Sequence, residues 1–269
     1  MLLQNIGEYK KFALSFKGGT ARGMGAIGVM RFFQEENLKP TIVAGSSAGS
    51  IIASAYALGI GWEKLQELLD NYNFMRLVTL KSFLRDGSFV NRKRYEDFLR
   101  PYCSDIRIED LPVKLVIYAS SLKTKQRYFI EKGSVLQAIV ASCSYPVFFP
   151  SPTYIDGEPM IDGDLISSFS SNFLKSRGAE VVIGVGHRNI EKTKPLQKWN
   201  IVNKLFSIYN IASGHINMYQ DVNDPPDYKI IYNTTGQSYF NFGLIDHTAK
   251  NAYLLTKKHK EEILKVISK

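Results

Sequence analysis

The sequence predicts a three-layer α/β/α protein with a mostly parallel central sheet, because two strand–loop–helix units follow one another near its start. In the first unit, the apolar run Phe12–Phe16 leads through a glycine loop into residues 24–38, whose apolar side chains recur at helical spacing. In the second, a short apolar strand at residues 41–44 leads through a Gly/Ser turn into a small-residue helix that begins near Ala48. Two successive βα units are typical of a parallel sheet covered by helices. Sites in such sheets form beyond the carboxyl ends of strands, so we expect the two loops to face each other.

The rest of the chain continues this alternation of strands and helices. Strands are predicted at residues 113–119, 126–131, 180–186 and Tyr228–Asn233, with a hairpin at residues 154–164. Helices are predicted at Trp62–Asp70, residues 92–102, Val135–Ser142, residues 198–222 and residues 247–269. Residues 74–90 interleave apolar and basic side chains, which fits either a lid that contacts an interface or a packed irregular connection. The aromatic, proline-bracketed stretch at residues 145–150 fits either a pocket wall or core packing.

The turn after the second strand, Gly45-Ser46-Ser47-Ala48-Gly49, fits the nucleophile-elbow pattern G-x-S-x-G centred on Ser47. Glycines at both ends of such a turn let the strand and helix backbones approach closely. The central serine then projects its hydroxyl at the positive end of the following helix. We therefore predict that Ser47 is a nucleophile. The alternative is an ordinary Gly/Ser turn without chemistry.

The glycine loop after the first strand, Gly18-Gly19-Thr20-Ala21-Arg22-Gly23, matches neither the dinucleotide pattern G-x-G-x-x-G nor a Walker A sequence. Successive backbone N–H groups at a helix start are suited to bind an anion. Beside a nucleophile elbow, that anion is the oxygen made negative by acyl transfer, and each preorganised donor to it is worth about 3–4 kcal/mol. We predict an oxyanion hole here, with Arg22 either reinforcing its field or anchoring the loop. A plain tight turn is the alternative.

A carboxylate follows the predicted hairpin. Met160 and Ile161 form an apolar strand end directly before Asp162-Gly163, so Asp162 lies at the carboxyl end of a strand. An isolated Asp-Gly pair is most often only a turn, so Asp162 becomes a candidate only together with the two loops.

The composition is that of a globular protein with an excess of positive charge. The 269 residues are 45% hydrophobic and 22% charged, which suffices for a sizeable core. The 34 Lys and Arg residues exceed the 25 Asp and Glu residues, and the net charge of +9 favours an anionic partner, either a lipid surface or nucleic acid. Because the lysines are dispersed and no nucleic-acid-binding motif is present, we expect no nucleic-acid partner.

Other features favour a cytoplasmic protein that uses no metal or cofactor. The N-terminus lacks the basic and apolar regions of a signal peptide, and no apolar run is long enough to span a bilayer. Any contact with an anionic membrane surface is therefore expected to be peripheral. Cys103 and Cys143 form no metal or redox motif and are expected to be reduced. No metal site is predicted, because no group of His, Cys and Asp has ligand spacing.

Taken in order, four motifs resemble the patatin-like phospholipases: the glycine loop, the serine elbow, a Ser-x-x-x-Pro-x-x-Phe-x-Pro-like stretch that ends near residue 150, and Asp162-Gly163, the second Asp-Gly pair after the hairpin turn at Asp156-Gly157. The resemblance runs from about residue 12 to residue 164 and somewhat beyond. It implies a patatin-like fold, with a catalytic core at residues 12–186 and a C-terminal extension at residues 187–269 packed on the same domain.

The resemblance also implies the roles of the site residues. Ser47 would attack an ester carbonyl and Asp162 would take its proton, without a histidine. The oxyanion hole would be formed by Gly18, Gly19 and Thr20, with Arg22 at the arginine position of the family. The glycines that complete the elbow and the Asp-Gly motif are Gly45, Gly49 and Gly163.

Two positions depart from the family pattern. Thr20 stands where the family usually has a third glycine, which would narrow the hole or turn one amide. Asp164 follows Asp162-Gly163 where the family has glycine or alanine. If Asp164 lies close, its charge would raise the pKa of Asp162; otherwise it points to solvent.

The function implied by the resemblance is a serine acyl hydrolase of the phospholipase A or lysophospholipase type, which cleaves phospholipids or lysophospholipids through an acyl-Ser47 intermediate. One alternative is an esterase triad of Ser47, Asp162 and His187, with His215 as a less well placed third member. Another is a lipid-binding or regulatory protein with little or no turnover, which the departures at Thr20 and Asp164 motivate. The sequence leaves the head group, the acyl chain and the oligomeric state open.

Overall fold

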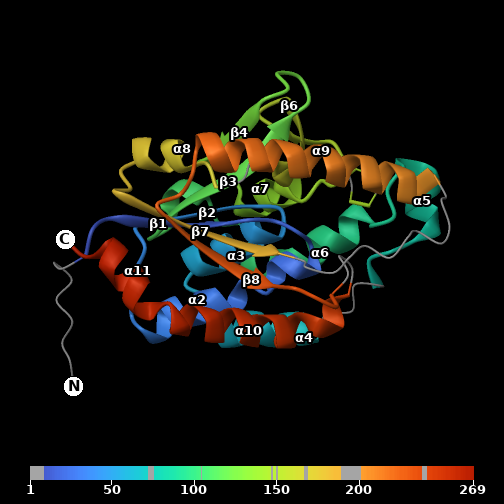
Figure 1. Ribbon diagram of the computed structural model, residues 1–269. Coiled ribbons are helices and arrows are strands. Elements are labelled where there is room, and N and C mark those ends of the chain that lie inside the picture. Colours follow the sequence, from blue (N-terminus) through green and yellow to red (C-terminus); the bar gives the residue numbers. More distant parts are fainter. Residues whose placement is uncertain are drawn as a thin grey trace.

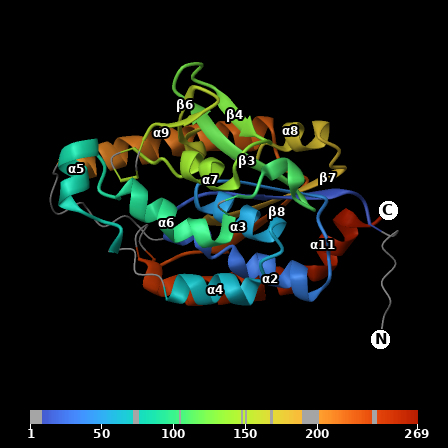
Figure 2. The same cartoon turned by 180° about the vertical axis from the view of Figure 1, so that it is seen from behind.

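The computed structural model describes residues 9–71, 76–103, 105–146, 148–149, 151–166, 169–188, 201–237 and 241–269. Within these residues an eight-stranded sheet lies between two layers of helices (Figures 1 and 2). The expected three-layer α/β fold with a mostly parallel sheet is therefore confirmed.

The strands are β1 (Phe12–Phe16), β2 (Ile42–Ser46), β3 (Lys114–Ser121), β4 (Arg127–Ile130), β5 (Thr153–Ile155), β6 (Glu158–Asp162), β7 (Val181–Arg188) and β8 (Tyr228–Asn233). Their order is β5-β6-β3-β2-β1-β7-β8, and β4 pairs with β3. The five strands from β3 to β8 in this order run parallel, whereas β4 and the β5–β6 hairpin add antiparallel pairs. Phe16 pairs with Gly45, so the glycine loop and the elbow leave the sheet at the same edge, as expected.

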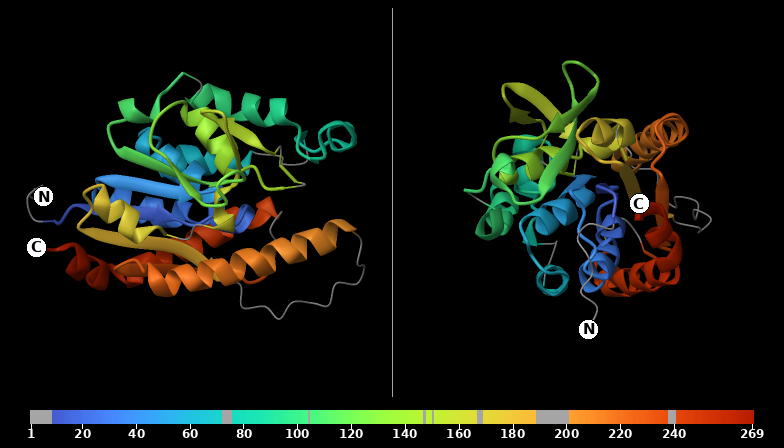
Figure 3. Two further views of the ribbon diagram at one scale, coloured as in Figure 1. Left: turned by 90° about the horizontal axis from the view of Figure 1, so that it is seen from above. Right: turned by 90° about the vertical axis from the view of Figure 1, so that its left-hand side faces the viewer.

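The helices are α1 (Ala21–Met24), α2 (Ile27–Glu35), α3 (Ala48–Ala57), α4 (Trp62–Asp70), α5 (Leu80–Asp86), α6 (Arg92–Cys103), α7 (Val135–Ser142), α8 (Ser171–Ser176), α9 (Ile201–Asn223), α10 (Ile245–Lys258) and α11 (Lys260–Ile267). Short 3-10 turns are η2 (Ile108–Asp110), η3 (Gly163–Leu165) and η4 (Phe242–Leu244). Helices α8 and α9 lie on one side of the sheet, and α2, α4 and α10 lie on the other (Figures 1 and 3).

Both faces of the central strands are buried, which explains their continuous apolar sequences. Along β1, Phe12, Leu14 and Phe16 pack into the larger core, beside α2 and α3. Ala13 points to the opposite face, where it joins a smaller core that includes Leu174 of α8. Successive side chains of a strand alternate between faces, so one strand contributes to both cores.

The prediction of one helix at residues 247–269 is wrong in one respect, because α10 and α11 are separate helices that meet at His259. The change of direction lets Ile263 and Ile267 pack with no exposed surface in the core. The short helices α5 and α8 were not predicted. None of the described helices is both long and apolar enough to cross a bilayer.

One of the two segments whose role was left open is residues 74–90. In the part of residues 74–90 that the structure describes, Phe83 stacks on Phe89 with ring centroids 4.4 Å apart, while Leu84 is exposed. This favours a packed connection for that part; Phe74 and Met75 lie outside the described residues.

Candidate active site

The serine elbow lies between the end of β2 and the start of α3. Ser47 has a φ of 48° and a ψ of −124°, a conformation that costs a non-glycine residue about 1–3 kcal/mol. The flanking glycines are required: a Cβ on Gly45 would lie 2.3 Å from the Gly49 oxygen, and a Cβ on Gly49 would lie 2.2 Å from the Phe16 oxygen. The G-x-S-x-G sequence therefore forms a sharp strand-to-helix turn with Ser47 at its apex.

Hydrogen bonds from outside the elbow hold this strained turn in place. The Ser47 N–H donates to Ser142 Oγ at 2.8 Å, and the Ser142 hydroxyl donates in turn to the Tyr118 carbonyl at 2.6 Å. The Ser50 hydroxyl donates to the Ser47 carbonyl at 2.6 Å. Both sides of the Ser47 backbone are thus fixed, and only its side chain is left to reorient.

Asp162 ends β6 and is completely buried. Its Oδ1 accepts the Asp164 N–H at 2.8 Å and the Tyr209 hydroxyl at 3.4 Å. Its Oδ2 has no hydrogen-bond partner within the described part of the chain. Burial raises the pKa of Asp162 to about 7, the charge of Asp164 adds to the rise, and the nearby Ser47 hydroxyl opposes it. This carboxylate is therefore poised to gain or lose a proton near neutral pH.

Asp164 joins the glycine loop to the elbow strand. Its Oδ1 accepts the Gly18 N–H at 3.1 Å and the Ser46 hydroxyl at 3.1 Å. Burial raises the pKa of Asp164, whereas Lys17 and these two donors lower it. The ionised form of Asp164 is thus stabilised by a nearby cation, Lys17, whereas the ionised form of Asp162 lies beside a second carboxylate. Asp164 does not point to solvent, and its repulsion of Asp162 has the predicted sign.

The glycine loop packs directly against the elbow. A Cβ on Gly18 would lie only 2.8 Å from the Cβ of Ser47. The Gly18 N–H is already bound to Asp164, so this amide is not a free donor. In the described residues no acceptor is found for the N–H groups of Gly19 and Thr20. Thr20 has a φ of 52°, so a threonine here holds a backbone conformation that favours glycine.

His187, at the end of β7, supports the glycine loop. Its Nε2 lies 3.0 Å from the Gly18 carbonyl, which can only accept, so Nε2 carries the proton. Although part of the ring borders a cavity, desolvation lowers the pKa of His187 to about 3, so the ring is neutral. The ring also fills the space where a Cβ on Gly19 would go, at 2.1 Å. His187 therefore contacts the loop, and none of its hydrogen bonds in the described residues reaches Asp162.

Arg22 anchors the loop from its other end. Its Nε donates to the Gln237 carbonyl at 2.6 Å, and the Gln237 side chain donates to the Ala21 carbonyl at 3.2 Å. The Tyr232 hydroxyl donates to the Arg22 carbonyl at 2.9 Å. These contacts favour the anchoring role that the sequence left open for Arg22.

Helix α9 contributes site residues that the sequence analysis missed. Tyr209 donates to Asp162, as above, and Asn217 Nδ2 donates to the Asp164 carbonyl at 3.1 Å. The Asn217 Oδ1 is buried without a partner in the described residues. A signal was present in the sequence: polar residues recur at helical spacing on one side of this helix, namely Tyr209, Ser213, Asn217 and Gln220.

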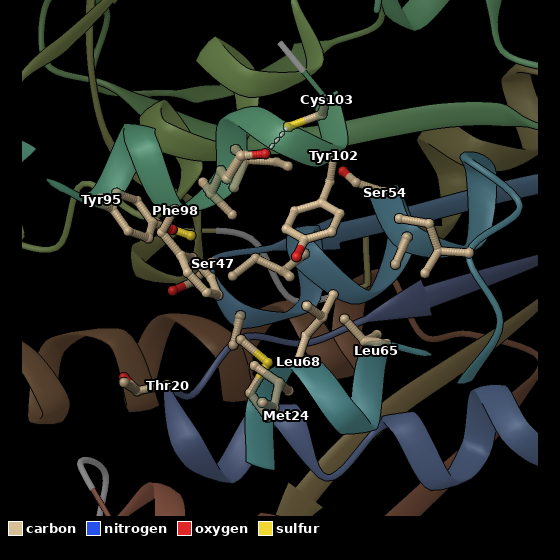
Figure 4. A pocket seen from close by; sticks show the side chains of 18 of the residues that line it. Thr20, Met24, Ser47, Ser54, Leu65, Leu68, Tyr95, Phe98, Tyr102 and Cys103 are labelled. Atoms are coloured by element: carbon tan, nitrogen blue, oxygen red, sulfur yellow. Dashed lines mark hydrogen bonds between the residues drawn. The ribbon is translucent and has the colours of Figure 1, made fainter. Parts of the chain in front are cut away.

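Ser47 lies at the junction of two cavities. A polar cavity of about 300 Å³ is lined by Ser47, Asp162 and residues of the glycine loop and α9. A second cavity, of about 90 Å³, runs from Ser47 along almost entirely apolar side chains of α3, α4 and α6 (Figure 4). Tyr145 and Phe149 border it, so the stretch at residues 145–150 is a pocket wall where it is described. Within the described residues no three His, Cys, Asp or Glu side chains are placed to hold a metal ion.

The family model of patatin-like phospholipases matches residues 14–170 of the chain. The chain belongs to the patatin-like phospholipase family. This confirms the resemblance that the glycine loop, the elbow and the second Asp-Gly carry. Two solved structures share the patatin fold at low identity. VipD from Legionella pneumophila has a TM-score of 0.53 and 16% identity, and the match covers 95% of this chain and 67% of that chain. A chain of the ExoU–SpcU complex of Pseudomonas aeruginosa has a TM-score of 0.51 and 16% identity, and the match covers 96% of this chain and 53% of that chain.

Relatives of this patatin-like chain include much longer proteins. Lysophospholipase nte1 of Aspergillus fumigatus is 22% identical over 197 residues, which are 72% of this chain and 13% of that protein. An uncharacterised NTE family protein of Mycobacterium bovis, Mb1092c, is 24% identical over 182 residues, which are 65% of this chain and 48% of that protein. The chain thus spans less than half the length of these relatives.

Proposed function

We propose that this patatin-like chain is a serine lipid acyl hydrolase that cleaves fatty-acyl esters of phospholipids or lysophospholipids through an acyl-Ser47 intermediate. The observation that carries the proposal is the place of Ser47 between an apolar cavity and a polar one that contains Asp162. An acyl chain fits the apolar cavity, and the ester and head group fit the polar one. The family and the lysophospholipase relatives support a lipid substrate.

In the first half of the reaction, Ser47 Oγ attacks the ester carbonyl carbon, and its proton passes to Asp162. Oδ2 of Asp162 accepts no hydrogen bond from the residues that the structure describes, so this oxygen has free capacity for the proton. The carbonyl oxygen becomes negative and accepts from the N–H groups of Gly19 and Thr20, for which no acceptor is found among the described residues. The bond to the leaving alcohol then breaks, and Asp162 returns the proton to that alcohol.

In the second half, water attacks the acyl-Ser47 ester. Asp162 takes a proton from the water, the bond between the acyl carbon and Ser47 Oγ breaks, and the proton passes to Ser47. A general base works best when its pKa lies near the working pH. The pKa of about 7 at Asp162 meets this requirement without a histidine.

The geometry supports the dyad over the triad that includes His187. In a triad the imidazole stands between the serine and the aspartate. Here the Nε2 of His187 is bound to the Gly18 carbonyl, and its depressed pKa opposes the protonation that a triad base undergoes. His215 is exposed on α9.

The apolar cavity also suggests which esters are cleaved best. Its volume of about 90 Å³ offers room for roughly six to nine water-sized groups, if each takes about 10–15 Å³. Each methylene that leaves water for such a site is worth about 0.8 kcal/mol. We therefore expect turnover to improve from short to medium-length acyl chains and then to level off.

The test is fatty-acid release from phospholipids, lysophospholipids and triglycerides, combined with labelling by a fluorophosphonate serine probe. Ser47→Ala should abolish both the labelling and the release, whereas Ser176→Ala, at an exposed serine on α8, should change neither. Labelling that persists in Ser47→Ala would refute the nucleophile. If wild-type protein binds these lipids but releases no fatty acid from any of them, the chain is instead the lipid-binding protein that the sequence left as an alternative.

A further inference from the structure

We propose that the outward face of α9 is a docking surface for anionic lipid bilayers. This outer face carries five apolar side chains that are between 62% and 75% exposed, namely Ile208, Ile211, Met218, Tyr219 and Val222, and the exposed His215 lies among them. An apolar cluster of this kind on one helix is unusual, because surface helices of globular proteins ordinarily turn their polar side to water.

The helix is amphipathic, but its apolar side faces outward and its polar side faces the protein. At about 100° per residue, the five outer residues fall within an arc of about 100°. The residues that face the protein fall within an arc of about 80° on roughly the opposite side, namely Tyr209, Ser213, Asn217 and Gln220. The inner side is polar because it covers the carboxylates of the site: Tyr209 binds Asp162 and Asn217 binds the Asp164 carbonyl.

The charge of the chain favours an anionic partner for this face. Residues 201–220 contain no Asp or Glu, and Lys204 is exposed near the start of the helix. The first carboxylate after them, Asp221, is paired with Lys229 at 3.3 Å. With a net charge of +9 on the chain, an anionic bilayer attracts the protein, and residues 201–220 add no carboxylate that would oppose this attraction.

The position of α9 explains why a lipid surface, and not another partner, would be useful there. The helix runs along one side of the molecule (Figure 3) and covers the polar cavity that holds Ser47 and Asp162. A bilayer docked on its outer face would lie beside the cavity whose proposed substrate is a lipid. This inference rests on the proposed lipid substrate for its choice of partner, but binding can be measured without turnover.

The test measures binding to vesicles of phosphatidylcholine with and without phosphatidylglycerol, in a Ser47→Ala background so that no lipid is consumed. A docking variant combines Ile211→Gln, Met218→Gln and Val222→Gln; glutamine keeps the helix propensity. Its matched control combines Leu122→Gln and Leu254→Gln, two exposed leucines on other elements. We expect the docking variant to bind the mixed vesicles at least tenfold more weakly than the parent, and the control to bind as the parent does. Equal binding by the docking variant would overturn the proposal.

A direct readout comes from added tryptophan reporters, each measured as the difference in emission from the parent, which already contains Trp62 and Trp199. Tyr219→Trp, on the outer face, should show a blue-shifted emission when phosphatidylglycerol vesicles are added. Tyr154→Trp, at a similarly exposed tyrosine on β5, should not. If the parent is instead a dimer in light scattering, and the docking variant is a monomer that still binds vesicles, then the face belongs to a second copy of the chain and the proposal fails. If the wild-type protein binds vesicles but releases no fatty acid, the proposed hydrolase activity is refuted and the docking surface is not.

Discussion

Asp164 Oδ1 accepts a hydrogen bond from the Gly18 amide at 3.1 Å, and this contact ties the carboxylates after β6 to the glycine loop after β1. The same oxygen holds the Ser46 hydroxyl, one residue before the elbow serine. Asp164 thus fixes the relative positions of all three parts of the proposed site while its charge lies close to Asp162. These two effects can be separated by substitution.

Asp164→Asn should shift the acidic limb of the pH dependence of kcat/KM to lower pH. The asparagine keeps an oxygen that can accept from Gly18 and Ser46, but it removes the negative charge that raises the pKa of Asp162. The wild-type limb is expected near pH 7. The measurement is a kcat/KM profile on a soluble ester. An unchanged limb would mean that the charge of Asp164 does not act on the catalytic base.

Tyr209→Phe should shift the same limb in the opposite direction. The Tyr209 hydroxyl donates to Asp162 and lowers its pKa, so its removal should raise the pH at which the base loses its proton. The control is Tyr219→Phe, which removes an exposed hydroxyl from the outer side of the same helix. A shift to lower pH in Tyr209→Phe would contradict this account.

Gly19→Ala should lower kcat/KM by about 100-fold or more, the cost of losing one oxyanion donor. Gly19 has a φ of 122°, and its added Cβ would lie 2.1 Å from His187 Nε2, so the loop must move. Gly178→Ala is the matched control, because its φ of 104° is equally unsuited to alanine but nothing lies within 4 Å. The control should lose stability without losing activity. If both variants have equal activity, the Gly19 amide is not part of the hole.

His187→Ala should reduce activity about tenfold at most, and His187→Gln should restore much of the loss. In our account His187 holds the Gly18 carbonyl through one hydrogen bond, which a glutamine amide can replace. In a triad, either change would cost on the order of 10⁶ in kcat. Steady-state kinetics of the two variants distinguish these outcomes, and a collapse in both would restore the triad.

Asp162→Asn should change the pH dependence of stability. The free energy of unfolding of the variant, minus that of wild type, should be larger at pH 8 than at pH 5. The pKa of Asp162 is raised from 3.8 to about 7 in the folded protein. Between these pH values folded Asp162 holds a proton that the unfolded chain has released, so the contribution of Asp162 to the free energy of unfolding falls as the pH rises from about 4 to 7. From pH 5 to pH 7 that amounts to about 2–3 kcal/mol. His187 has the opposite dependence, because its lowered pKa makes stability rise between about pH 3 and 6.5.

For that reason the informative quantity is the difference between variant and wild type in urea unfolding at the two pH values. Asp156→Asn, at the exposed hairpin turn, serves as the control and should leave the difference at zero. If Asp162→Asn also leaves it at zero, Asp162 is already ionised at pH 5 in the folded protein.

Local sequence patterns predicted much of the fold and the centre of the site. The elbow around Ser47 was readable because its glycines are required within one turn, where neighbouring backbones collide with any Cβ. Asp162 was readable because it is the last residue of a strand and is followed at once by Gly163. The division of the last helix at His259 was not readable, because residues 256–262 contain no glycine or proline to mark a helix end.

The sequence by itself therefore determined the layered α/β fold, the family and the two candidates Ser47 and Asp162, since each was read from short motifs whose own residues are close together in the chain. Only the tertiary structure decided which groups surround that pair. It assigned Asp164 to the Gly18 amide, turned His187 onto the Gly18 carbonyl and brought Tyr209 to Asp162 across 47 positions. Such contacts join distant segments, and their hydrogen bonds and desolvation depend on packing that no local pattern records.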